Sequence, residues 1–153
     1  MHTDVQPPTL RDPRPADEAA WRRLWAAYCD FYETSVREAV TAATWRRMLD
    51  PGSPFIGRLA ESGNAVCGFS VCVLHEGTWT TDPVCYLEDL FVDAGARGAG
   101  IGHALVQDVI DRARQKGWSR VYWHTHADNA VARRVYDRFV ASDGHVRYRV
   151  ILR

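Results

Sequence analysis

Residues 86–105 constrain the fold of this chain most, because they join an apolar strand to a glycine-rich turn and the start of a helix. The predicted strand, residues 84–92, is apolar at almost every position, which is typical of a strand covered on both faces of a sheet. Glu88 and Asp89 interrupt it. Carboxylates are costly to bury, so in a central strand they usually meet a partner or take part in chemistry.

The turn after this strand carries Arg97, Gly98, Gly100 and Gly102. Because glycine has no Cβ, the backbone N–H groups of such a turn can approach a phosphate closely, and the helix N-terminus adds partial positive charge. A P-loop would need Gly-Lys-Ser/Thr at its end, which this turn lacks, and a dinucleotide fingerprint would need glycine in place of His103. The remaining pattern, Arg-x-x-Gly-x-Gly, is compatible with a phosphate site and also with a simple turn.

The rest of the chain predicts one α/β domain over residues 1–153, with residues 1–8 as a flexible tail. Asp17 is the predicted N-cap of a first helix, whose apolar stripe recurs at helical spacing through Tyr28. Further helices are expected over residues 36–49, 101–116 and 129–139, and strands over 9–14, 55–60, 65–75, 120–126 and 146–152. The strand–helix–strand unit from 84 to 126 should place its two strands parallel.

Charge and composition exclude several classes of protein. The formal net charge is +0, from 19 basic and 19 acidic residues without a like-charge run, which disfavours nucleic-acid binding. No apolar stretch is long enough to span a membrane, so no membrane partner is expected. The 4 cysteines have neither metal nor disulfide-framework spacing and are interpreted as small buried apolar residues in a reducing cytoplasm.

Residues 86–92, Tyr-Leu-Glu-Asp-Leu-Phe-Val, followed by residues 97–102, Arg-Gly-Ala-Gly-Ile-Gly, resemble the acyl-CoA-binding core of the GCN5-related N-acetyltransferases. The Leu-Glu-Asp strand is similar to that of spermidine/spermine N-acetyltransferases and of the small histone/polyamine and D-amino-acid acetyltransferases. The resemblance extends from about residue 17 to the end. It implies a three-layer α/β fold with a mixed central sheet flanked by helices, acetyl-CoA as cofactor, and direct transfer of an acetyl group to a primary amine.

This chemistry needs a base, because a lysine-type amine with a pKa near 10.4 is neutral in only about one molecule in a few thousand at pH 7. The resemblance assigns that role to Glu88, with a structural carboxylate as the alternative. Asp89 should alternate to the opposite face unless a bulge intervenes, and is given at most a supporting role. The departing thiolate needs a proton donor, which the resemblance assigns to Tyr136 in an Asn-x-x-Ala-x-x-x-Tyr pattern. A half-buried packing tyrosine is the alternative.

The resemblance also implies a cofactor-binding set. In the family, backbone groups at Phe91 and Val92 pair with the pantetheine arm and supply the oxyanion donor, while Arg97 and the glycine turn hold the pyrophosphate. The full predicted set is Leu90, Phe91, Val92, Arg97, Gly98, Ala99, Gly100, Ile101, Gly102, His103, Asn129 and Ala132.

The predicted acceptor mouth is acidic and aromatic, which favours a cationic amine. Its members are Asp30, Tyr32, Glu33, Glu88, Tyr122 and His124. A polyamine is slightly favoured over an amino acid, which would need a cation such as Arg58 or Arg147 for its carboxylate. His124 and His126 share one face of a predicted strand but have no third ligand at useful spacing, so no metal site is expected.

Two alternatives remain open at this stage: a non-catalytic acyl-CoA sensor, and an acetyltransferase acting on protein lysines or histone tails. The chain departs from the family after Phe139, where Val140 and Ala141 replace the usual glycine and phenylalanine. The predicted last strand, with Tyr148, Val150 and Leu152, could pair with the sheet edge of a second subunit in a homodimer.

Overall fold

The computed structural model describes residues 6–153; residues 1–5 of the expected flexible tail lie outside the described part of the chain. The helices and strands are β1 (Thr9–Arg11), α1 (Glu18–Phe31), α2 (Glu38–Leu49), β2 (Phe55–Ser62), β3 (Ala65–His75), β4 (Val84–Val92), α3 (Ile101–Lys116), β5 (Arg120–Tyr122) and α4 (Ala130–Tyr136). Two 3₁₀ turns, η1 (Pro15–Asp17) and η2 (Ala94–Ala96), precede α1 and α3.

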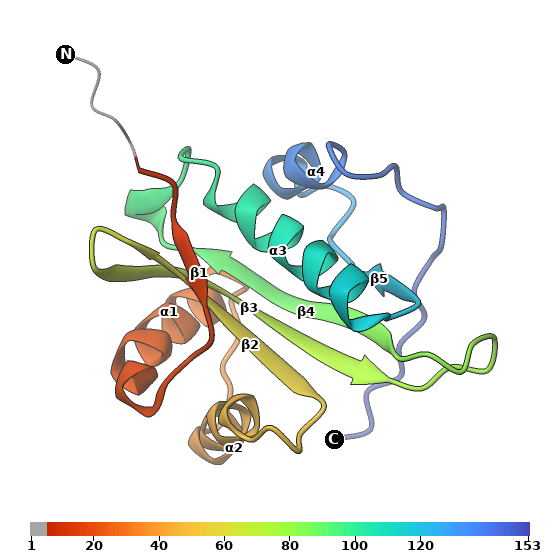
Figure 1. The fold of residues 1–153 in the computed structure, drawn as a ribbon, viewed down its shortest axis with the longest axis horizontal. Helices are drawn as coiled ribbons and strands as arrows, with labels where there is room; N and C mark the ends of the chain where they lie inside the picture. Colours follow the sequence, from red (N-terminus) through yellow and green to blue (C-terminus); the bar gives the residue numbers. More distant parts are fainter. Residues whose placement is uncertain (1–5) are drawn as a thin grey trace.

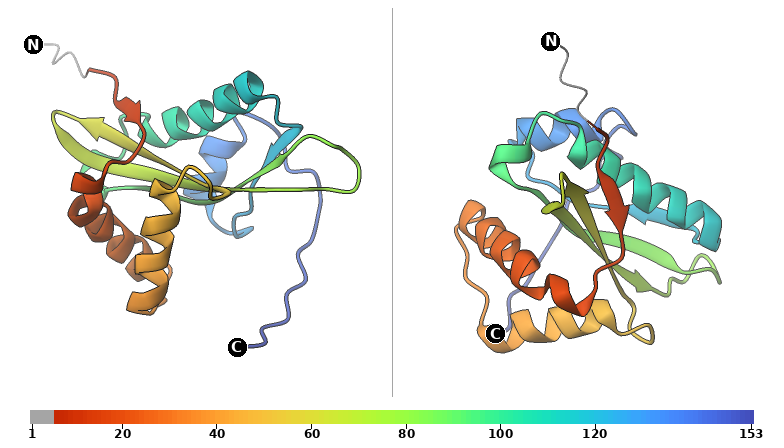
Figure 2. Two further views of the ribbon diagram at one scale, coloured as in Figure 1. Left: turned by 60° about the horizontal axis from the view of Figure 1, so that its bottom comes forward. Right: turned by 60° about the vertical axis from the view of Figure 1, so that its left-hand side comes forward.

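The five strands form one sheet in the order β1-β2-β3-β4-β5. All neighbouring strands are antiparallel except β4 and β5, which are parallel as predicted for a strand–helix–strand unit. Helices α1 and α2 cover one face of the sheet, and α3 and α4 lie on the other (Figures 1 and 2). This arrangement confirms the predicted three-layer α/β fold with a mixed sheet.

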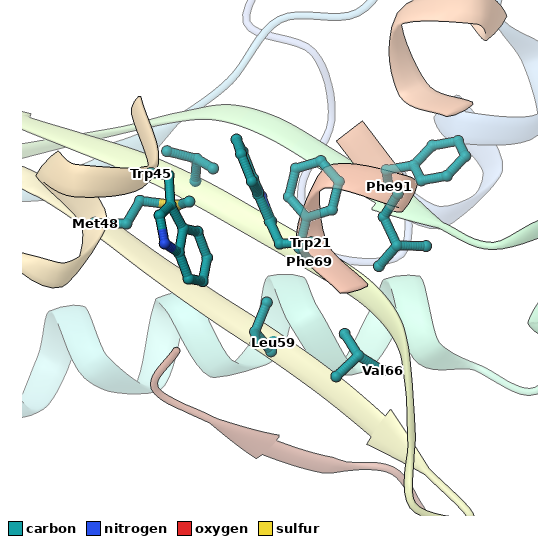
Figure 3. Packing of buried hydrophobic residues seen from close by; sticks show 9 residues of the cluster. Trp21, Trp45, Met48, Leu59, Val66, Phe69 and Phe91 are labelled. Carbon is teal, nitrogen blue, oxygen red and sulfur yellow. The ribbon is translucent and has the colours of Figure 1, made fainter. Parts of the chain in front are cut away.

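The face under α1 and α2 is packed with aromatic side chains. Trp21 of α1 is fully buried and stacks on Trp45 of α2 at 5.4 Å between ring centroids, with Phe69 of β3 edge-on at 6.1 Å. Figure 3 shows these rings side by side above Leu59 and Val66. Burial of such large rings is the main contribution to this half of the core, and it explains why the apolar stripe of α1 is so regular.

The opposite face is covered by α3, which begins and ends where the sequence predicts. Its apolar stripe, Ile101, Leu105, Val109 and Ala113, is buried against the sheet. Gly117 ends the helix in a left-handed conformation, φ 74°, which glycine adopts without a Cβ penalty.

Strand β4 contains a bulge, which interrupts the simple alternation of its side chains. Val71 of β3 pairs with Asp89 and the next residue, Cys72, pairs with Leu87, so Glu88 is the extra residue. Leu87 packs on the α3 side with Cys72, while Asp89 bonds to α1. Because Glu88 follows Tyr86 by two positions, and Asp89 lies on the α1 side, both carboxylates project from the same face of the sheet. The bulge therefore places Asp89 on the same face as Glu88, instead of the opposite face that simple alternation predicts.

Strand β5 is shorter than the predicted strand over residues 120–126. Its register with β4 runs from Val84↔Arg120 to Tyr86↔Tyr122 and then ends. Beyond Tyr86, the edge of β4 that faces β5 has no paired strand. The two parallel strands separate at this point, which leaves backbone N–H and C=O groups of β4 open to another partner.

The predicted last strand over residues 146–152 is absent. This segment has no helix or strand, and Val146, Tyr148, Val150 and Leu152 are 75–91% exposed. The alternation of its side chains suits a strand, but a strand needs a neighbour, and β5 offers an edge of only three residues. Figure 2 shows the segment passing to the side of the sheet that α1 and α2 occupy, away from the sheet itself.

Candidate active site

A pocket of about 210 Å³ lies at the open end of β4, where β5 has separated from it. It is bounded by β4, by the end of α1 and by the start of α4. Its lining residues are Phe31, Tyr32, Leu90, Phe91, Val92, Arg97, Asn129 and Val131. The strand edge that β5 leaves unpaired therefore forms one wall of a concave site.

The glycine turn lies directly after this wall. Gly98 and Gly100 have φ angles of 87° and 77°, and a Cβ added to either would meet no atom within 4 Å. Both positions thus require glycine for the backbone conformation and are open to solvent. Gly100 is the N-cap of α3, and its carbonyl accepts the N–H of Ala104 at 3.0 Å. The amides of Ile101, Gly102 and His103 precede the first intrahelical bond and remain available to an anion.

Arg97 connects the turn to the pocket. Its Nε donates to the carbonyl oxygen of Val92 at 3.0 Å. Its guanidinium lies 5.7 Å from the ring centre of Phe31 and 5.5 Å from that of Phe91. These contacts hold a positive charge at the pocket rim, beside the free amides of the turn.

Asp89 is mostly buried and accepts a 2.7 Å hydrogen bond from the hydroxyl of Tyr28. Burial raises the pKa of Asp89 to about 6, against the lowering effect of the Tyr28 bond, and the charge of neighbouring Glu88 raises it further. Burial and the Asp89 charge in turn raise the pKa of Tyr28. The Asp89 carboxylate therefore binds a proton more tightly than an ordinary aspartate does.

Glu88, beside it in the bulge, is exposed. Its negative charge contributes to the raised pKa values of Tyr28, Tyr86 and Tyr122, after burial in each case. The Glu88 carboxylate therefore adds negative charge to the surroundings of these three phenol groups and is itself open to solvent. This is an accessible acceptor for a proton from a bound amine.

Tyr136 stands at the end of α4. Its ring packs against Trp123 at 5.4 Å, and burial raises its pKa to about 12, with a smaller contribution from Tyr32. Tyr32 lines the pocket, whereas Tyr136 lies outside its lining. A phenol with this pKa keeps its proton at neutral pH and can donate it.

Asn129 and Ala132 lie at the start of α4. The Asn129 side chain accepts the N–H of Ala132 at 3.3 Å, so it is the N-cap that the sequence predicts, and it also lines the pocket. The side chain of Ile101 is buried in the core, which leaves only its backbone for a ligand. The ring of His103 stacks on Phe139 at 4.4 Å.

The structure does not gather the predicted acceptor residues at one point. Tyr32 lines the pocket, but Asp30 and Glu33 are exposed and outside its lining. Tyr122 and His124 lie instead with Tyr86 on the far side of Glu88, where the Tyr86 and Tyr122 rings stack at 5.0 Å. Among residues 6–153, no group of three or more His, Cys, Asp or Glu side chains has the geometry of a metal site.

Sequence reasoning missed several residues that surround the site. Phe31 and Val131 line the pocket, and Tyr28 bonds to Asp89. The apolar spacing of α1 explains Tyr28 as a core residue, so nothing in the sequence indicated its bond to a carboxylate on β4. The cation–π contact between Arg97 and Phe31 likewise joins residues far apart in the sequence, and no local pattern predicts it.

Cys29, Cys67, Cys72 and Cys85 are buried and unbridged. Within residues 6–153, none of the helices combines the length and the apolar character needed to cross a bilayer.

Comparison with known proteins assigns the chain to a family of enzymes. The acetyltransferase (GNAT) family model matches residues 19–140. The D-amino-acid N-acetyltransferase HPA3 of Saccharomyces cerevisiae is 35% identical over 138 residues, which cover 88% of this chain and 85% of that protein.

Solved structures share the fold. An aminoglycoside acetyltransferase from an uncultured soil metagenomic sample, in complex with trehalose, has a TM-score of 0.80 at 18% identity, covering 95% of this chain and 97% of that chain. AAC(6')-Iy, in complex with the bisubstrate analogue CoA-S-monomethyl-acetylneamine, has a TM-score of 0.81 at 16% identity, covering 97% of this chain and 99% of that chain. At these sequence identities, the structural similarity shows a shared fold.

Proposed function

The chain belongs to the acetyltransferase (GNAT) family, and from that premise we propose that it transfers the acetyl group of acetyl-CoA directly to the primary amine of a small molecule, an amino acid. One observation carries the proposal: the open edge of β4 joins a phosphate-type turn at one end to an accessible carboxylate, Glu88, at the other. The pocket lies beside this edge and is lined by Leu90, Phe91, Val92 and Arg97.

The residues of the turn and pocket fit acetyl-CoA. The space around Gly98 and Gly100 is open where a Cβ would stand, and Arg97 adds a guanidinium beside the free amides of α3. We propose that these groups hold the pyrophosphate and that the unpaired edge of β4 at Leu90, Phe91 and Val92 binds the pantetheine arm. Asn129 lines the same pocket from α4. When bound, acetyl-CoA supplies an activated acetyl thioester.

Two side chains supply the proton chemistry in this proposal. Glu88 is exposed and receives the proton of the acceptor amine, directly or through water. Tyr136 holds its proton at neutral pH because burial raises its pKa to about 12, and it donates to the departing sulfur. The four cysteines are buried and none lies in the pocket lining, which favours direct transfer over a cysteine-bound intermediate.

The acceptor is better explained as an amino acid than as a polyamine. Asp30 and Glu33, the carboxylates expected to bind a polyamine, are exposed and stand outside the pocket lining. An amino acid needs a cation for its carboxylate. Arg58 is paired with Asp108 and Asp12, whereas Arg147 is exposed and its charge opposes the rise in the pKa of Tyr86. The similarity to a D-amino-acid N-acetyltransferase supports the same choice.

The test is an acetylation assay with acetyl-CoA and a panel of D- and L-amino acids, spermidine, an aminoglycoside and a histone-tail peptide. Free CoA release and the mass of the product would be measured. We expect turnover with amino acids, and its loss in Glu88→Gln. Binding of acetyl-CoA without transfer to any amine would instead favour a non-catalytic sensor, and turnover confined to spermidine or to the peptide would reject the amino-acid assignment.

We also propose that the protein acts in the cytoplasm as a homodimer. Four buried free thiols suit a reducing compartment. Residues 146–152 alternate apolar side chains that are almost fully exposed, and the outer edge of β5 is unpaired. Such a segment can complete the sheet edge of a second subunit.

A further inference from the structure

Glu88 lies at the position where β4 is least supported by its neighbouring strands. On the β3 side it is the extra residue between Leu87 and Asp89 and has no cross-strand partner. On the β5 side the register already ends at Tyr86. A bulged residue that neither neighbouring strand pairs keeps one backbone conformation only if other groups hold it. The position of the Glu88 carboxylate therefore depends on how the residues beside it are held.

The residue after Glu88 is held by a hydrogen bond from another layer of the fold. The hydroxyl of Tyr28, on α1, donates to Oδ1 of Asp89 at 2.7 Å, across 61 positions of sequence. Asp89 is mostly buried, and a hydrogen bond that is shielded from water is stronger than an exposed one. Because Asp89 also pairs with Val71 of β3, both its backbone and its side chain are fixed.

The ring of Tyr28 is itself held by aromatic rings from α1 and from the sheet. Within α1, it stacks on Trp25 at 5.4 Å between ring centroids, and Tyr32 meets it edge-on at 4.9 Å. From the sheet, Phe69 and Phe91 each meet it edge-on at 6.0 Å. A ring packed on several sides has little freedom to move, so its hydroxyl reaches Asp89 from a fixed position.

A second polar contact joins α1 to the end of β4 without involving the bulge. Nη1 of Arg23 pairs with Asp93 at 3.0 Å, and Nη2 donates to the carbonyl oxygen of Val66 at 3.2 Å. Asp93 directly follows β4, beyond the bulge. The same helix is thus attached to the same strand at two places, and only the Tyr28 contact lies next to Glu88.

We propose that Tyr28 is a positioning residue for acetyl transfer: its hydrogen bond to Asp89 holds the bulge of β4 in the conformation that presents Glu88 to the acceptor amine. This inference rests on the proposed function, in which Glu88 receives the proton of the amine. Tyr28 lies outside the pocket lining, so it acts through Asp89 and not by contact with the cofactor. A displacement of about 1 Å in a reacting group can lower the rate about 100-fold, so one such bond is enough to matter.

The test compares kcat/KM at pH 7 for the amino acid that the wild type acetylates best. Tyr28→Phe keeps the ring and removes the hydroxyl, and we expect kcat/KM to fall by about 10- to 100-fold. The KM for acetyl-CoA should change by less than about twofold. Asp89→Asn keeps an acceptor for the hydroxyl and should lose much less than Tyr28→Phe. Arg23→Gln removes the other polar link of α1 and is the matched control, with kcat/KM expected at the wild-type value.

The pH profile separates positioning of a base from general damage to the fold. At pH 7 the acceptor amine is mostly protonated and needs a base, whereas with rising pH it becomes neutral without one. The ratio of kcat/KM between the wild type and Tyr28→Phe should therefore shrink from pH 7 to pH 10. A ratio that stays constant over this range would overturn the inference, because it would mean that the hydroxyl supports the fold alone.

A double variant covers the case in which Tyr28→Phe is unstable because Asp89 is left buried without its partner. Tyr28→Phe combined with Asp89→Leu removes both partners, so its unfolding free energy should recover towards that of the wild type. Its kcat/KM should nevertheless stay as low as in Tyr28→Phe, because the bond is still absent. Wild-type kcat/KM in the double variant would overturn the inference and leave the acetyltransferase function in place.

Two further outcomes would also decide against the proposal. A loss of turnover in Asp89→Asn as large as in Glu88→Gln would make Asp89 the base, and the role of Tyr28 as a positioning residue for Glu88 would be wrong. If the wild-type protein acetylates no amine at all, the proposed function itself is wrong, and this inference with it.

Discussion

Glu88 and Asp89 are consecutive in β4, yet their side chains share one face of the sheet and have different surroundings. Glu88 is exposed, while Asp89 is mostly buried against Tyr28. The bulge at Glu88 produces this arrangement, because it shifts the alternation of the strand by one residue. Two carboxylates on one strand can therefore take different roles, one accessible to an amine and the other held as part of the packing.

Asp89 leads to a prediction about stability and pH. Its folded-state pKa of about 6 lies above the ordinary value of 3.8, so the native state binds more protons than the unfolded state between these pH values. The contribution of Asp89 to stability therefore falls as pH rises through this window. In Asp89→Asn, which keeps an acceptor for Tyr28, we expect unfolding free energy to exceed that of the wild type by about 1–3 kcal/mol at pH 8. Near pH 4 the two proteins should be equally stable within about 1 kcal/mol.

Urea unfolding at both pH values measures this difference. Asp128→Asn, an exposed aspartate, is the control and should not change the pH dependence. A gain in Asp89→Asn that is the same at pH 4 and pH 8 would mean that the raised proton affinity of Asp89 does not contribute to stability.

Tyr136 gives a prediction about turnover. Tyr136→Phe keeps the ring against Trp123 and removes the hydroxyl. If the hydroxyl donates the proton to the leaving sulfur, kcat should fall by about 100-fold or more, with little change in the KM for acetyl-CoA. Tyr148→Phe, at a tyrosine that is 91% exposed, is the matched control and should turn over like the wild type. Wild-type kcat in Tyr136→Phe would make Tyr136 a packing residue.

For single residues, the sequence predicted candidate side chains better than it predicted the groups that they contact. The N-cap role of Asn129 was predictable from local spacing and is confirmed by its bond to Ala132. The bonds of Asp89 to Tyr28 and of Tyr122 to His75 join residues 61 and 47 positions apart, respectively, and no local pattern contains them. Asp17 illustrates the same limit: it precedes α1 as predicted, but its carboxylate binds Arg11 instead of capping the helix.

Among the elements, α3 and the turn before it were the most predictable. The helix has a regular apolar stripe, a glycine at each end and cations in its last turn, and each signal agrees with the others. Strand β5 was less predictable. Residues 120–126 have the composition of one continuous strand, but the chain leaves the sheet after Tyr122 although the edge of β4 beyond Tyr86 is open. The separation of these two strands opens the pocket.

The two glycines that flank α3 allow a controlled test of the cofactor site. Gly100 and Gly117 both have left-handed backbones, with φ of 77° and 74°, and neither has an atom within 4 Å of an added Cβ. Valine at either position should therefore cost a similar free energy, about 1–2 kcal/mol. Acetyl-CoA binds the native state and should raise the melting temperature of the wild type and of Gly117→Val. We expect that rise to disappear in Gly100→Val, where the Cβ and its methyl groups would occupy the phosphate position.

Thermal melts with and without acetyl-CoA at a concentration about 100 times its Kd provide the measurement, because the expected stabilisation is then about 2.7 kcal/mol. A rise of the same size in both variants would exclude the turn as the phosphate site. Loss of the rise in both would mean that valine disturbs α3 as a whole.

For the whole molecule, the fold class and the order of the layers followed from the sequence, but its C-terminal end did not. Residues 146–152 alternate like a strand, and the structure leaves their side chains exposed, Tyr148 at 91% and Leu152 at 86%. A strand is stable only against a neighbouring strand, and in the structure this segment has none. Its structure therefore depends on which partner edge it meets, and local sequence patterns do not contain that information.

The homodimer proposal makes this testable. If residues 146–152 pair with the sheet edge of a second subunit, the protein should sediment as a dimer at micromolar concentration, and replacing Tyr148 and Leu152 together by Ser should shift it to the monomer. Replacing the nearby exposed Val140 by Ser, outside the alternating segment, should leave the dimer intact.

The free energy of dimer formation is expected to come from apolar area removed from water, at about 25 cal/mol per Å². Loss of two large side chains should therefore weaken association by at least about 100-fold. A wild-type protein that sediments only as a monomer would reject the pairing.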